Sequence, residues 1–124
     1  MKKLILILGD QLDLESAALQ DFNIEVDKVL MVESANEAQH VWSHKARIAL
    51  FLSAMRHFAK RLEENGFPLV YIKQSPKPIV DELRDKLISG KFTHLVCVEP
   101  GEWRLTKALE GLAAELNVIL EVRS

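Results

Sequence analysis

The residues Leu4–Leu8 form a run of five apolar side chains that stops at a glycine, with Asp10 and Gln11 directly after it. A short apolar run closed by turn residues is typical of a strand buried on both faces of a parallel sheet. Glycine at position 9 permits a turn that a side chain would resist, so the backbone can present Asp10 and Gln11 above the sheet. Open α/β sheets bind their ligands at that edge.

Four further apolar runs follow, at 28–32, 69–72, 93–98 and 117–122. Helical spacing between the runs predicts helices over 13–20, from Ser43 to Asn65-Gly66, from Pro76-Lys77-Pro78 to Gly90, and over 102–116. This alternation predicts an α/β fold, a Rossmann-like five-stranded parallel sheet in the order 3-2-1-4-5 with helices on both faces. In that order the first and fourth strands are neighbours, and the loops that follow them face each other across one crevice.

Acidic residues stand at the carboxyl ends of three predicted strands: Asp10, Glu33 and Glu99, with Glu102 close by. Carboxylates gathered at one edge suit a divalent cation, or they accept hydrogen bonds from the hydroxyl and ring N–H groups of an organic ligand. No Asp-rich loop joins these residues, which favours the organic ligand. The polar stretch 33–43 is longer than most strand-to-helix connections, and long connections at this edge are often binding loops.

Several kinds of chemistry find no support in the sequence. The glycine-rich dinucleotide fingerprint and the Walker loop are absent, and no serine stands in a nucleophile-elbow context. Cys97, the only cysteine, lies inside an apolar run and is expected to be a buried, inert thiol. We expect no catalysis and no metal site from this chain alone.

Charge and hydropathy also limit the partners of the chain. A formal net charge of −2 gives no overall field toward nucleic acid or an anionic membrane. No apolar run approaches the roughly 20 residues of a membrane span, so a cytoplasmic protein is expected. The basic residues of the long helix are interpreted as a solvated face, whereas Trp103 is expected to point away from the core of its own helix.

Three stretches of the chain resemble one known family. They are Leu8-Gly9-Asp10-Gln11-Leu12, then Val29-Leu30-Met31-Val32-Glu33, and the segment from His44-Lys45 to Phe58. With the segment Glu99-Pro100-Gly101-Glu102-Trp103-Arg104, they resemble the amino-terminal domain of the deoxyribodipyrimidine photolyase-related proteins, the iron–sulfur bacterial cryptochromes and (6-4) photolyases. The resemblance covers nearly the whole chain.

The resemblance implies a single α/β antenna domain over residues 1–124. Such a domain holds a ribityl-lumazine pigment and passes excitation to FAD. FAD and a 4Fe-4S cluster belong to a helical domain that follows in family members and through which DNA is bound, so the chain resembles a fragment of a lyase or a light-sensing cryptochrome. Carried over by position, the residues expected to contact the pigment are Gly9, Asp10, Gln11, Leu12, Glu33, Ser34, Glu37, His44 and Glu99.

The same residues leave one alternative of a different class. A stand-alone nucleotide-binding or regulatory α/β domain would act through oligomer contacts, and it would bury Trp103 between subunits. The absence of phosphate-cradling glycines argues against it.

Overall fold

A single parallel sheet organises the chain, as described by a computed structural model for residues 1–34 and 45–124. The strands are β1 (Lys3–Leu6), β2 (Lys28–Ser34), β3 (Leu69–Ser75), β4 (His94–Val98) and β5 (Ile119–Arg123). Between them lie η1 (Ala17–Leu19), α2 (Lys45–Glu64), α3 (Ile79–Ser89) and α4 (Trp103–Leu116). The order β3-β2-β1-β4-β5 and the α/β class confirm the prediction from sequence.

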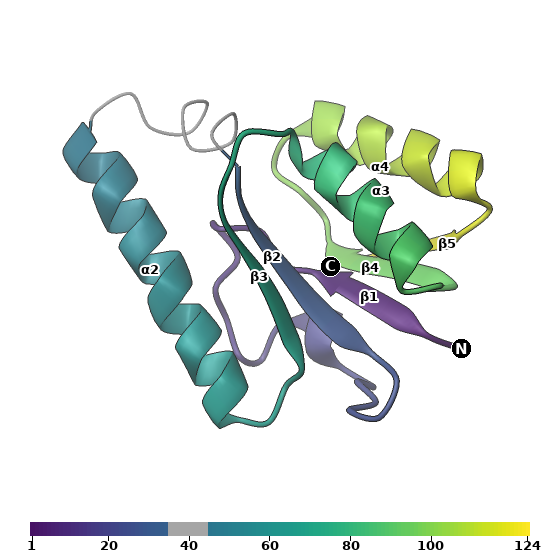
Figure 1. The fold of residues 1–124 in the computed structure, drawn as a ribbon, viewed down its shortest axis with the longest axis horizontal. Helices are drawn as coiled ribbons and strands as arrows, with labels where there is room; N and C mark the ends of the chain where they lie inside the picture. The colour runs from purple at the N-terminus through teal and green to yellow at the C-terminus, as the bar shows by residue number, and fades with distance from the viewer. Residues whose placement is uncertain (35–44) are drawn as a thin grey trace.

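The sheet is covered on both faces (Figure 1). Successive side chains of a strand point to opposite faces. Leu4 and Leu6 accordingly join a core packed with α3 and α4, whereas Ile5 and Ile7 join a second core packed with α2 and η1. This double burial explains why the central strands read as unbroken apolar runs.

The connection between β1 and β2 differs from the prediction. A helix was predicted over 13–20, but only a single 3₁₀ turn forms there, at Ala17–Leu19. The Asp13 carboxylate accepts the backbone N–H of Glu15, and the Ser16 hydroxyl accepts that of Ala18. Side chains that bond their own backbone in this way compete with helical hydrogen bonds.

Gly9 is required for close packing. Its φ lies outside the left-handed region, so the turn that follows does not depend on glycine. A β-carbon at this position would lie 2.2 Å from Cζ of Phe51 and 3.0 Å from Sδ of Met55. Because both side chains belong to α2 and are buried, the missing side chain lets this helix sit against the end of β1.

Replacing Gly9 with alanine is therefore expected to lower the free energy of unfolding by about 1–3 kcal/mol through overpacking. Chemical denaturation measures the change. Gly101→Ala is the matched control, because a β-carbon there would meet nothing within 4 Å. Equal stability of the two variants would show that α2 does not press against Gly9.

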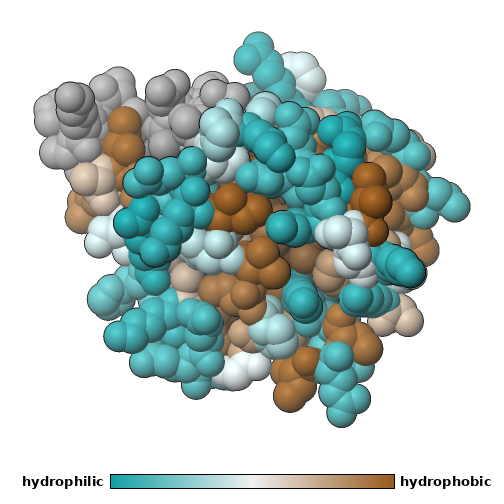
Figure 2. Space-filling view, viewed as in Figure 1, coloured by the Kyte–Doolittle hydropathy of each residue, from teal (hydrophilic) through white to brown (hydrophobic). Residues whose placement is uncertain are grey.

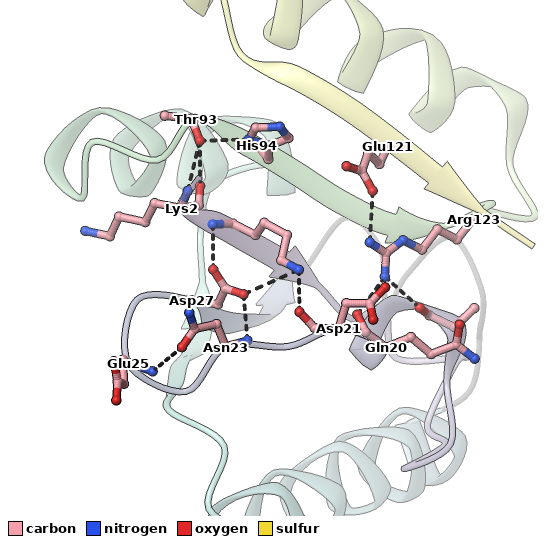
Figure 3. A network of polar contacts seen from close by, with 12 residues as sticks. Lys2, Gln20, Asp21, Asn23, Glu25, Asp27, Thr93, His94, Glu121 and Arg123 are labelled. Atoms are coloured by element: carbon pink, nitrogen blue, oxygen red, sulfur yellow. Dashed lines mark hydrogen bonds and ion pairs between the residues drawn. The ribbon is translucent and has the colours of Figure 1, made fainter.

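A polar network closes the amino end of the sheet (Figure 3). Asp27, only 1% exposed, accepts the backbone N–H groups of Lys3 and Asn23, both at 2.9 Å. The Lys3 ammonium lies 3.5 Å from the same carboxylate and donates to the backbone carbonyl of Asp21 at 2.6 Å. The network ties the β1–β2 connection to the first strand.

None of the described helices is long and apolar enough to cross a membrane.

Candidate functional site

The loops after β1 and β4 meet at the carboxyl edge of the sheet. The Gln11 side-chain amide donates to the backbone carbonyl of Glu99 at 3.1 Å and approaches that of Val98 at 3.4 Å. Asp10 and Glu99 are exposed on either side of this bridge. The two loops therefore face each other as the strand order predicts, and carboxylate and amide groups lie at this edge of the sheet.

Glu33, at the end of β2, is buried and holds several protein groups. Its carboxylate accepts two hydrogen bonds from Arg56 of α2, at 2.6 and 2.9 Å. It also accepts the Tyr71 hydroxyl at 2.5 Å and the Gln74 backbone N–H at 3.1 Å. Because its side chain is only 1% exposed, Glu33 serves as an internal anchor that joins β2, β3 and α2.

The same contacts set the ionisation of the group. Burial alone raises the pKa of Glu33, but the bonds from Arg56, Tyr71 and Gln74 outweigh it and hold that pKa below its ordinary value. Burial and the bond to Glu33 raise the pKa of the Tyr71 phenol. At neutral pH the anchor is a carboxylate that accepts from a guanidinium, a neutral phenol and a backbone amide.

Ser34 is also buried, and it points toward the loop between β3 and α3. Its hydroxyl donates to the backbone carbonyl of Lys77 at 3.3 Å. In the same loop the Ser75 hydroxyl donates to Glu82 at 2.7 Å. The side chains of Glu33 and Ser34, the two residues predicted to contact a ligand at the end of β2, are therefore both buried.

Comparison with known proteins identifies the family. Residues 5–124 match the family described as deoxyribodipyrimidine photo-lyase-related protein. The chain belongs to this family. It is also 35% identical over 129 aligned positions to a (6-4) photolyase of Agrobacterium fabrum. That alignment covers all of the chain but 25% of the relative, so this photolyase-related chain spans about a quarter of that protein's length.

The remaining predicted site residues of this photolyase-related chain divide into two groups. Gly9 is buried under α2, and Leu12 is half-buried against the core on the α2 side. Glu37 and His44, with Ser43 at the predicted start of the long helix, lie outside the described residues. The structure thus brings Gln11 beside Glu99 and leaves the side chains of Asp10 and Glu99 exposed at this edge of the sheet.

The partners of Glu33 were not predicted from the sequence. Arg56 is expected on a solvated face, and its side chain is 42% exposed, but it also forms two hydrogen bonds with the buried carboxylate, which its helical position did not indicate. Gln74 adopts a left-handed backbone with φ 46°, a conformation that is uncommon outside glycine. The sequence showed Glu33 and Ser34 as a polar pair at the end of an apolar strand, but this pattern did not indicate which residues bond to them.

The described part of the chain contains no group of three or more His, Cys, Asp or Glu side chains placed to hold a metal ion. Cys97 is buried as predicted, and burial raises the pKa of its thiol to about 11. At neutral pH it stays protonated, which makes it a weak nucleophile. Trp103 is 66% exposed at the start of α4, as its helical position predicted.

Proposed function

We propose that residues 1–124 act as the antenna domain of a photolyase-related flavoprotein for light-dependent DNA repair or light sensing. The ligand is a ribityl-lumazine pigment bound at the crevice between the loops after β1 and β4. FAD, a 4Fe-4S cluster and the main DNA contacts belong to the remaining part of such a protein. When bound, the pigment supplies light absorption and passes excitation energy onward.

The observation that carries the proposal is the juxtaposition of Asp10, Gln11 and Glu99 in a chain of this family. A ribityl chain offers several hydroxyl groups and a lumazine ring offers polar edges, so the ligand requires both acceptors and donors. The two exposed carboxylates accept hydrogen bonds from hydroxyls. The Gln11 N–H groups donate within the protein to the carbonyls of Glu99 and Val98, which leaves the side-chain oxygen of Gln11 as a further acceptor. These groups fit the ligand without any phosphate-binding loop.

Glu33 and Ser34 take a supporting part in this proposal. Their side chains are occupied by Arg56, Tyr71, Gln74 and the loop at Lys77, so they fix the end of β2, the strand beside β1. Gly9 and Leu12 set the path of the first loop, and Glu37 and His44 complete the set of proposed contact residues. The chain acts by holding the pigment in a fixed position, and no bond is made or broken.

Replacing Asp10 with alanine is expected to weaken binding of 6,7-dimethyl-8-ribityllumazine about tenfold, because a hydrogen bond to a charged acceptor contributes roughly 1.5–3 kcal/mol. A fluorescence titration of the purified chain measures the dissociation constant. Because Asp10 is exposed, stability to denaturant should stay unchanged.

Glu15→Ala is the control, since it removes the same charge from an exposed position of the same loop. Equal affinities for the wild type and Asp10→Ala would remove Asp10 from the site. Saturable binding of ATP in place of the lumazine would favour the alternative, a nucleotide-binding domain.

A further inference from the structure

The positive charge of the chain is concentrated on one helix. α2 contains five of the 16 Lys and Arg residues but only two of the 18 Asp and Glu residues. Both acids, Glu63 and Glu64, stand at its last turn, and no acidic residue occurs from 45 to 62. The formal net charge of −2 is therefore the sum of a basic helix and an acidic remainder of the chain.

These cations lie on the outward side of α2. Arg47, Lys60 and Arg61 are exposed, and none of them is ion-paired within the residues that the structure describes. Figure 2 shows hydrophilic side chains along much of this helix. Lys60 and Arg61 are adjacent, and Arg56, which is paired with Glu33, lies four residues before Lys60, a spacing at which like charges do not support a helix. An exposed helix that interacts only with water more often alternates its charges.

The surface beside these cations is hollowed. An open hollow of about 490 Å³ lies between α2 and the end of β3. Its lining includes Arg56, His57, Lys60 and Gln74 together with the small residues Ala49 and Ser53. The lining contains cations, a hydroxyl and an amide but no carboxylate, and its small side chains leave room for a polyanion to approach the helix.

We propose that this outward face of α2 binds the phosphate backbone of nucleic acid. From Arg47 to Arg61 the helix rises about 21 Å, at 1.5 Å per residue. A compact anion would reach only part of that length, whereas duplex DNA presents one charge per roughly 1.7 Å of its axis. Contacts of this kind position a protein on DNA without reading its sequence. The role is separate from the pigment site, which lies at the carboxyl edge of the sheet.

A protein partner would rest on the apolar side chains beside these cations. A second hollow, of about 370 Å³, adjoins the first along α2, because Ser53 and His57 line both. Its lining adds Arg61 to the apolar side chains of Leu12, Leu50 and Phe58. Leu50 is 67% exposed there. An apolar partner surface would depend on this leucine, whereas phosphate binding would not.

The test is the fluorescence anisotropy of a labelled 20-base-pair duplex of arbitrary sequence, titrated with the chain at several salt concentrations. Charge reversal at both Lys60→Glu and Arg61→Glu is expected to weaken binding at least tenfold. It should also lower the magnitude of the log–log salt slope by about 2, because two phosphate contacts are lost.

Two controls distinguish the possible results. Lys28→Glu with Lys107→Glu makes the same change of net charge on exposed residues of β2 and α4, and it should weaken binding less than threefold. Leu50→Ser should leave the affinity unchanged. No binding by the wild type, equal losses in both charge-reversed variants, or an equal loss in Leu50→Ser would overturn the proposal. Lumazine binding, measured on the same variants, should not change in any of them.

Discussion

Replacing Asp27 with alanine is expected to lower the free energy of unfolding by about 3–5 kcal/mol, the usual cost of breaking a buried ion pair from one side. The change removes the carboxylate that faces the Lys3 ammonium, and both groups are almost completely buried. It also leaves the backbone N–H groups of Lys3 and Asn23 without their acceptor. Urea denaturation followed by circular dichroism measures the loss.

Two further variants serve as comparisons for Asp27→Ala. Asp27→Asn keeps one carbonyl acceptor but removes the charge, so an intermediate loss is expected. Asp85→Ala removes a carboxylate from an exposed pair with Lys77 and should leave stability nearly unchanged, because solvent screens such a pair. A loss below 1 kcal/mol in Asp27→Ala would mean that the network at the amino edge does not hold the β1–β2 connection.

Replacing Glu33 with alanine is expected to cost about 2–4 kcal/mol of stability, because part-buried donors lose the buried carboxylate that accepts from them. Most of this cost comes from the Tyr71 hydroxyl and the Gln74 backbone N–H. Arg56 contributes less, since its exposed guanidinium can return to water. Tyr71→Phe removes one donor without leaving another unpaired, and it should cost less than about 1.5 kcal/mol.

The effect of Glu33→Ala should also depend on pH. The pKa of Glu33 is lowered in the folded chain, so its ionised form contributes stability above the ordinary carboxyl pKa of 4.5. That contribution is lost as the pH falls through 4.5 toward the folded value. The difference between wild type and variant should therefore shrink in acid, and a difference that grew there would contradict the assigned contacts.

The fold was predictable from the sequence because strands that are buried on both faces appear as continuous apolar runs. β1 (Lys3–Leu6) overlaps the apolar run 4–8, and β2 (Lys28–Ser34) contains the run 28–32. The three- and four-residue spacing of apolar side chains along α2 matches the face that this helix buries. Within residues 1–34 and 45–124, the 13–20 segment is the element that was predicted wrongly. There Asp13 and Ser16 bond backbone groups locally, and the apolar spacing did not reveal that competition.

The candidate site was predictable in position but not in detail. Strand order alone brings Gln11 beside Glu99, because neighbouring parallel strands end at the same edge. It does not tell how α2 is placed along the sheet, and that placement brings Arg56 within reach of Glu33, 23 positions earlier in the chain. The role of Gly9 was likewise hidden, because the Phe51 ring that excludes a side chain comes from a distant segment.

Mapping the pigment by NMR tests the central claim most directly. Two-dimensional ¹H–¹⁵N spectra of the labelled chain would be recorded during titration with 6,7-dimethyl-8-ribityllumazine. The antenna proposal predicts saturable shifts in the backbone amides of residues 9–12 and 99, and none in the outward face of α2 around Lys60. Shifts centred on α2, or no saturable shift at the carboxyl edge of the sheet, would contradict it.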